Sequence, residues 1–231
     1  MQRCRRVHVR CGIARRRTMT VKQERAVLTR EKIIAGAADV FYRQGFGGAT
    51  LSDITAAAGV TKGALYFHFQ SKEHVALAVI EAEHEIATAA ATAILDTTTG
   101  PLESMLRLCS DLAGRLTTDP IVRAGIRLTT ETSTFDRSMA RPYEDWLATF
   151  EALTLAATEA GELRAGTDAE KLAHFIIPAF TGVQMVSDVF TERADLRRRV
   201  REMWEILLPA IVPPENQNSI EWMLEAAFPI R

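Results

Sequence analysis

The chain has 231 residues, 47% of them hydrophobic, and a formal net charge of -1, a composition typical of a folded globular protein. Its apolar runs are far shorter than the roughly 18 to 20 residues that a membrane-spanning helix requires, so we predict no membrane partner. The three cysteines, Cys4, Cys11 and Cys109, form no CxxC pair, which favours a reducing compartment and a core position for Cys109.

The charge is divided unevenly along the chain. Residues 1–18 carry +7, residues 19–70 carry +2 and the remainder carries -10. A polyanion should therefore meet the N-terminal part, because the acidic remainder repels it. Residues 1–18 lack the apolar run of about 7 to 15 residues that a secretory signal needs. We interpret them as a disordered basic extension, or as the product of a start assigned upstream of Met19.

Helical patterns account for the N-terminal part. Apolar residues recur at helical spacing from Thr29, and Gly45 ends that helix, where a left-handed conformation is convenient. Thr50 is an N-cap signal for a second helix over 51–58, which Gly59 stops.

A very short third helix follows. Thr61 is its N-cap, and Ser71 begins a long fourth helix soon after. Two short helices around a glycine turn are typical of a helix-turn-helix, whose second helix enters the DNA major groove with its N-terminus foremost. Of the aromatic residues in this short segment, Phe67 and Phe69 are predicted to lie in the hydrophobic core. The residues of this segment expected to contact DNA are Thr61, Lys62, Gly63, Ala64, Tyr66 and His68.

Some of these residues also have an ordinary explanation. Lys62 fits a solvated lysine, Tyr66 a packing residue and His68 a surface histidine. Helix N-termini offer further phosphate sites, because their free amides and dipoles attract anions. The residues expected there are Thr29 and Arg30 at the first helix, Thr50 at the second and Lys72 at the fourth.

A second helical unit follows the helix-breaking segment LDTTTGP at 95–101. Periodic apolar residues predict helices over 102–117, 120–130 and 143–160. The segments STFDRSMARP and AGELRAGTD are predicted to be loops.

Two late helices, over 172–190 and 196–211, differ from the others. The first is apolar on nearly every face and contains Pro178, which should kink it. The second carries a wide apolar stripe opposite its arginines. A helix that is apolar all round needs a partner on each side, so the first is either the central core helix or part of a four-helix dimer interface. An amphipathic piece at 220–228 is expected to be a loosely docked tail.

The sequence carries no constellation typical of an enzyme. Its histidines form no HExxH pair and no nucleophile elbow is present. The segment GFGG at 45–48 lacks the preceding strand and following lysine of a phosphate loop. We therefore predict no catalytic residue, no metal site and no cofactor.

The segment TREKIIAGAADVFYRQGFGGATLSDITAAAGVTKGALYFHFQSKEHVALAV, residues 29–79, resembles the N-terminal domain of the TetR family of bacterial transcriptional repressors. Within that family, GVTKGALYFHFQSKE is similar to the γ-butyrolactone receptor group, as are DPIVRAGIRL, RPYEDW and GVQMVSD further along the chain. The resemblance extends from about residue 20 to residue 213.

This resemblance implies an all-α homodimer. It implies a helix-turn-helix DNA-binding domain, which we place over 19–70, and a larger ligand-binding and dimerisation domain, which we place over 71–214. The tail over 215–231 lies outside the resemblance. In the γ-butyrolactone receptor group, a tryptophan corresponding to Trp146 lines the ligand pocket. The helices corresponding to 169–190 and 194–211 make the dimer.

A small neutral lactone offers few hydrogen bonds, so its affinity must come mainly from apolar burial, at about 25 cal/mol per Å². The pocket therefore needs apolar walls and a few polar groups. The residues predicted as walls are Trp146, Phe150, Ile126, Phe180 and Val183, and those predicted as polar groups are Glu83, Arg127 and Gln184.

We therefore expect a cytoplasmic, nucleoid-associated repressor that binds double-stranded operator DNA as a homodimer and is released by a small-molecule inducer of γ-butyrolactone type. The fourth helix is the expected lever between pocket and DNA. The same fold could instead sense a furan, a butenolide or an antibiotic intermediate. A small helical enzyme and a structural adaptor are alternatives from other classes.

Overall fold

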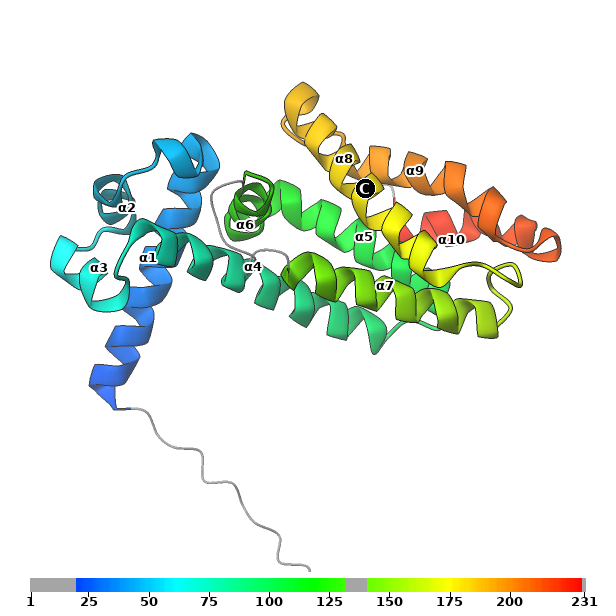
Figure 1. The fold of residues 1–231 in the computed structure, drawn as a ribbon, viewed down its shortest axis with the longest axis horizontal. Helices are drawn as coiled ribbons and strands as arrows, with labels where there is room; N and C mark the ends of the chain where they lie inside the picture. The colour runs from blue at the N-terminus through cyan, green and yellow to red at the C-terminus, as the bar shows by residue number, and fades with distance from the viewer. Residues whose placement is uncertain (1–19, 132–140, 230–231) are drawn as a thin grey trace, which may run out of the picture.

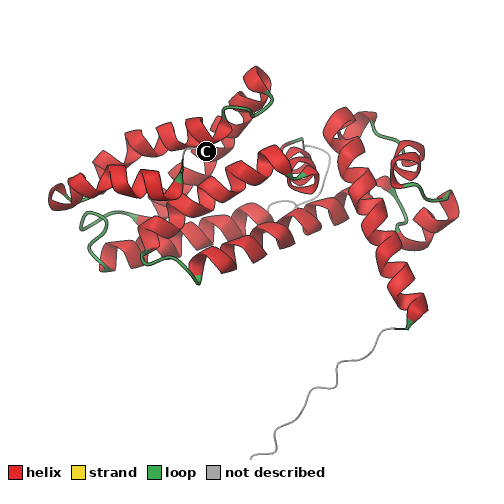
Figure 2. Cartoon of the chain, turned by 180° about the vertical axis from the view of Figure 1, so that it is seen from behind, coloured by secondary structure: helices red, strands yellow, loops and turns green. Residues whose placement is uncertain are grey.

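The computed structural model describes residues 20–131 and 141–229, and every regular element within these ranges is helical (Figures 1 and 2). The predicted all-α class is therefore confirmed. The N-terminal extension with Cys4 and Cys11, and most of the loop predicted at 133–142, lie outside the described residues. The described elements are α1 (Val21–Gly48), α2 (Leu51–Ala58), α3 (Lys62–His68), α4 (Lys72–Leu95), α5 (Pro101–Thr118), α6 (Pro120–Thr130), α7 (Arg141–Glu159), α8 (Ala169–Thr191), α9 (Leu196–Ile211), the 3-10 helix η2 (Pro214–Ser219) and α10 (Ile220–Ala227).

The first helix is longer than predicted. It begins after Thr20, whose side chain accepts a hydrogen bond from the Gln23 backbone while the Gln23 side chain accepts one from the Thr20 backbone. The predicted start at Thr29 is wrong, because that residue lies two turns inside α1, where its hydroxyl donates to the Arg25 carbonyl at 2.8 Å. The predicted break at Gly45 is confirmed by its φ of 69°.

The capping signals of the next three helices are confirmed. Thr50, Thr61 and Ser71 each accept a hydrogen bond from the backbone amide three residues further on. Gly59 ends α2 in the left-handed conformation at a φ of 62°. Local side-chain chemistry therefore sets the length of α3 at 7 residues.

The first three helices lie at one end of the molecule, and α4 runs from them alongside the helices of the larger unit (Figure 1). Their apolar core includes Ile33, Ile54 and Leu65, each with an exposed fraction of 0%. The same core includes the N-terminal half of α4 and two residues of α6, Ala124 and Leu128. The division between residues 70 and 71 remains a proposal, since α4 and α6 are shared between the two units.

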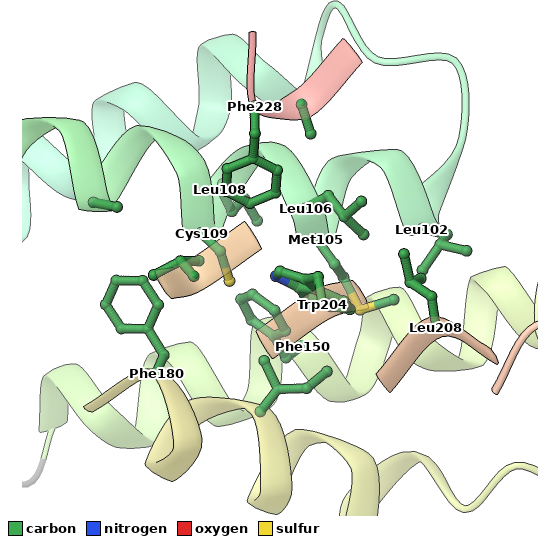
Figure 3. Packing of buried hydrophobic residues seen from close by; sticks show 14 of the residues in the cluster. Leu102, Met105, Leu106, Leu108, Cys109, Phe150, Phe180, Trp204, Leu208 and Phe228 are labelled. Atoms are coloured by element: carbon green, nitrogen blue, oxygen red, sulfur yellow. The ribbon is translucent and has the colours of Figure 1, made fainter. Parts of the chain in front are cut away.

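The larger unit packs α5, α7, α8, α9 and α10 around the fully buried Trp204 of α9 (Figure 3). In that view, side chains of α5 lie on one side of Trp204 and Phe150 of α7 lies on the other. Leu224 and Phe228 at the C-terminal end have exposed fractions of 1% and 4%. The prediction of a loosely docked tail is therefore wrong, because these apolar side chains complete the core.

The helix α8 is buried on one face and exposed on the other. It packs against α7 and α9 through residues such as Ile176 and Phe180. Among the described helices, α8 has the length and hydropathy to cross a membrane, a test that core helices of globular proteins also pass. The large apolar side chains that α8 and α9 leave exposed are Phe175, Met185, Val186, Val189, Phe190 and Ile206.

Candidate DNA-binding and ligand-binding sites

The N-terminus of α3 is open to solvent. Thr61 is exposed and its hydroxyl oxygen accepts a hydrogen bond from the Ala64 amide at 3.2 Å. Lys62 and Gly63 are also exposed, whereas Leu65 is fully buried and fixes the helix to the core. The predicted groove-facing residues Thr61, Lys62 and Gly63 therefore lie together on one accessible turn, with Ala64 half-buried behind them.

The aromatic residues of α3 divide differently from the prediction. Phe69 has an exposed fraction of 4%, as expected of a core residue, whereas Phe67 is 77% exposed and its predicted core position is wrong. The physical reason is helical phase, because Phe67 follows the buried Leu65 by two residues and so faces the opposite side. Tyr66 is 57% exposed and His68 is half-buried. The sequence prediction did not recognise Phe67 as a surface residue, although its separation of two residues from Leu65 was the available signal.

The ammonium group of Lys72 is held by the end of α1. Its ammonium group donates hydrogen bonds to the carbonyl oxygens of Phe46 at 2.7 Å and Ala49 at 2.9 Å. It also lies 4.4 Å from the centroid of the Phe46 ring. Lys72 therefore stabilises the C-terminal end of α1, where carbonyl groups lack helical partners, and its contact with DNA stays a prediction.

The other predicted phosphate contacts are partly supported by geometry. Thr29 has no free helix terminus beside it, since α1 begins at Val21, so the predicted helix-terminus phosphate site is not at this residue. Arg30 lies 5.5 Å from the Phe69 ring centroid and 4.0 Å from a carboxylate oxygen of Glu81. Its side chain is still 46% exposed. Thr50 is exposed at the start of α2.

A narrow cavity lies inside the larger unit. Its volume is about 60 Å³, enough for a few water molecules. Trp146 and Phe150 of α7 meet there edge to face, with ring centroids 6.5 Å apart. Burial raises the pKa of the Cys109 thiol to about 12, so the group stays uncharged. The wall is formed by Leu108, Cys109 and Leu112 of α5, Ile126 of α6, Tyr143, Trp146 and Phe150 of α7, and Ile177, Phe180, Thr181 and Gln184 of α8.

Five of the eight residues predicted for the ligand pocket line this cavity. They are Ile126, Trp146, Phe150, Phe180 and Gln184. Sequence reasoning missed the α5 residues, Tyr143, Ile177 and Thr181. The available signal was spacing, because residues three and four apart share a helix face: Tyr143 lies three residues before Trp146, and Thr181 lies three before Gln184.

Three predicted pocket residues lie elsewhere. Val183 faces the groove between α8 and α9, because it precedes the cavity-lining Gln184 by one residue and so points about 100° away from it around the helix. Glu83 is 2% exposed and packs against Gly125, between α4 and α6. Burial, with a further contribution from the charge of Asp119, raises the pKa of Glu83 to about 8, so this carboxyl group is neutral at pH 7.

Arg127, the third, contacts the DNA-binding unit instead of the cavity. Its guanidinium group donates hydrogen bonds to the Tyr42 carbonyl and to Glu131, and Glu131 accepts one from the Phe46 amide at 2.9 Å. Arg123, one turn earlier, lies 4.2 Å from the centroid of the Tyr42 ring. We call this set of contacts, from Arg123, Arg127 and Glu131 to Tyr42 and Phe46, the α6–α1 clamp.

The α6–α1 clamp bears on the prediction that the fourth helix connects the pocket with the DNA-binding unit. Among the described residues, α4 contributes no side chain to the wall of this cavity, so the cavity gives no support to the fourth helix as the lever. The helix α6 does touch both sites. Ile126 lines the cavity, and its neighbour Arg127 holds the end of α1.

Two family models match the chain, one for the tetR family of bacterial regulatory proteins over residues 33–79 and one for the tetracyclin repressor-like C-terminal domain over residues 99–213. The A-factor receptor protein of Streptomyces griseus is 37% identical over 193 residues, which are 84% of this chain and 67% of that protein. The chain belongs to the TetR family. The resemblance inferred from the sequence is thereby confirmed, and TetR-family proteins are transcriptional regulators.

Solved TetR-family structures are similar to the whole described fold. The TetR-family protein CprB from Streptomyces coelicolor, in complex with its operator sequence, matches with a TM-score of 0.79 and 31% identity, covering 90% of this chain and 100% of that chain. A crystal structure of an ArpA-like gamma-butyrolactone receptor matches with a TM-score of 0.74 and 31% identity, covering 89% and 98% of the two chains.

Proposed function

We propose that this TetR-family protein is a homodimeric repressor that binds a pseudo-palindromic operator and leaves it when an inducer of γ-butyrolactone type fills the cavity. The observation that carries the proposal is that one helix, α6, touches both an aromatic-lined cavity and the DNA-binding unit. The similarity to the A-factor receptor protein and to gamma-butyrolactone receptors supports the ligand class. Regulators of this kind act in the cytoplasm, and we place this one on nucleoid DNA.

The exposed turn at the start of α3 supplies the DNA contacts in this proposal. In a helix-turn-helix dimer, the two recognition helices enter successive major grooves whose centres lie about 34 to 36 Å apart. Gly63 has no side chain and Ala64 a small one, which allows the backbone to approach closely, and Lys62 brings a positive charge to the phosphates or base edges. The exposed Phe67 ring is suited to apolar contact with a thymine methyl group.

Lys62→Ala is expected to weaken operator binding and to flatten its salt dependence. Loss of one phosphate contact reduces the slope of log affinity against log salt concentration by about one. The measurement is an operator titration at several salt concentrations. Lys171→Ala is the matched control, since Lys171 is an exposed lysine on α8 that pairs with Asp168. Unchanged affinity of the Lys62 variant at every salt concentration would contradict the proposed docking.

The narrow cavity explains how a ligand can act on α6. Ligand pockets generally measure about 300 to 1,000 Å³, whereas this cavity measures about 60 Å³. Binding must therefore move the helices of its wall apart, and Ile126 places α6 among them. Because Arg127 and Glu131 hold Tyr42 and Phe46, displacement of α6 reorients the DNA-binding unit. Coupling of this kind typically amounts to about 1 to 3 kcal/mol.

Arg127→Met is expected to uncouple the two sites. The variant keeps the aliphatic stem of the side chain and loses the hydrogen bonds to Tyr42 and Glu131. A saturating inducer should lower the operator affinity of the wild type about 5-fold to 150-fold, and that of Arg127→Met much less. Arg115→Met is the matched control, because Arg115 forms a similar pair with Asp111 on α5. Full release of the Arg127 variant by inducer would rule out the clamp as the connection.

A further inference from the structure

The cavity contains one polar side chain without a partner. Gln184 of α8 lines the wall and is 2% exposed. Within the part of the chain that the structure describes, its side-chain carbonyl oxygen is buried and accepts no hydrogen bond. The hydroxyl groups three residues before and after it on α8 are already used: Thr181 donates to the Ile177 carbonyl at 3.0 Å and Ser187 to Asp195 at 2.7 Å. The Gln184 carbonyl oxygen is therefore left for whatever enters the cavity.

An unpaired amide in an apolar wall is unfavourable. Moving such a group out of water without a compensating hydrogen bond destabilises the protein, so buried amides nearly always have partners. The rest of the wall is mainly aliphatic and aromatic, which gives the ligand affinity without fixing its orientation. A single polar group in such a site is well placed to decide which ligands bind.

The chemistry of an amide narrows the matching group. Its carbonyl oxygen accepts a hydrogen bond, and its nitrogen donates two. A ligand hydroxyl can donate to the oxygen, whereas a ketone or ester carbonyl can only accept from the nitrogen and leaves the oxygen bare.

We propose that Gln184 is the specificity-determining residue of this site and that it pairs with a hydroxyl group on an otherwise apolar ligand. The proposal rests on the function proposed above and adds a requirement to it. A ligand of the same size that lacks the hydroxyl fills the cavity but leaves the Gln184 oxygen unpaired. Sites built to bind a hydroxyl discriminate strongly against such analogues.

The test uses three γ-butyrolactones with identical carbon skeletons, whose alkyl side chain carries a secondary hydroxyl, a ketone or a methylene at one position. Their affinities for the full-length protein are measured by titration calorimetry, which requires no knowledge of the operator. The wild type should bind the hydroxyl compound about tenfold or more tightly than the other two. This comparison needs no variant and so does not depend on the folding of one.

Two variants then assign the preference to Gln184. Gln184→Met keeps the length of the side chain without its hydrogen bonds, and should bind all three compounds with similar affinity. Gln184→Glu retains an acceptor and should keep the preference for the hydroxyl compound. Equal binding of the three lactones by the wild type, or an undiminished preference in Gln184→Met, overturns this inference alone. Failure of the wild type to bind any of the three overturns both this inference and the proposed ligand class.

Discussion

Ile206→Asp is expected to convert the dimer into monomers and to abolish operator binding. Ile206 on α9 is 80% exposed, and Val189 and Phe190 on α8 are 82% and 73% exposed. Ile206 lines a groove between α8 and α9 together with Phe175 and Val186, and Val189 and Phe190 extend the exposed apolar surface further along α8. A contiguous apolar surface of this kind marks a protein interface. In a two-fold dimer the same patch is used by both subunits, so one substitution places two carboxylates in the interface.

The effect on DNA binding should be large because a dimer holds two half-sites with one association event. Linking two binding modules strengthens binding by about 10² to 10⁴ over a single module, so the monomer should lose at least about a hundredfold in operator affinity. Sedimentation equilibrium measures the oligomeric state, and an operator shift measures the affinity. Leu155→Asp is the control, since Leu155 is 53% exposed on α7. A variant of Ile206 that remains dimeric at micromolar concentration would place the interface elsewhere.

Signals within a few residues predicted the local structure of this chain well. Thr50, Thr61 and Ser71 cap their helices because the geometry of an N-cap involves only the next three residues. The start of α1 was missed because the residues after Thr20 carry no apolar period, and the pairing of Thr20 with Gln23 was the only signal.

Tertiary packing determines which of the predicted pocket residues line the cavity, and local sequence signals do not contain that information. The apolar residues Trp146, Phe150 and Phe180 were placed in the cavity correctly, since any large apolar side chain on a core-facing stripe lies inside. The polar residues were predicted less well, because only Gln184 of the three lines the cavity. Arg127 lies on the face of α6 that contacts the DNA-binding unit, and Glu83 lies on the face of α4 that contacts α6. Which face of a helix meets which neighbour depends on how the helices cross, and the sequence does not show that.

Trp146→Ala is expected to leave operator binding intact and to abolish the response to inducer. Trp146 packs with the core of the larger unit, whereas Ile33, Leu65 and the other residues that hold α3 in place form a separate core. Removing the indole should therefore not disturb the recognition helix. An operator titration without inducer checks this first expectation.

The loss of induction follows from the area that the indole offers to a ligand. A tryptophan side chain can bury about 150 to 250 Å², and at about 25 cal/mol per Å² the half of that area facing a ligand contributes roughly 2 to 3 kcal/mol. Inducer affinity should consequently fall by a factor of about 30 to 150. Trp222→Ala is the matched control, because Trp222 on α10 is 63% exposed and does not line the cavity. Release of the Trp146 variant at the wild-type inducer concentration would mean that the ligand binds outside this cavity, because a bound ligand could not lose the indole wall without losing affinity.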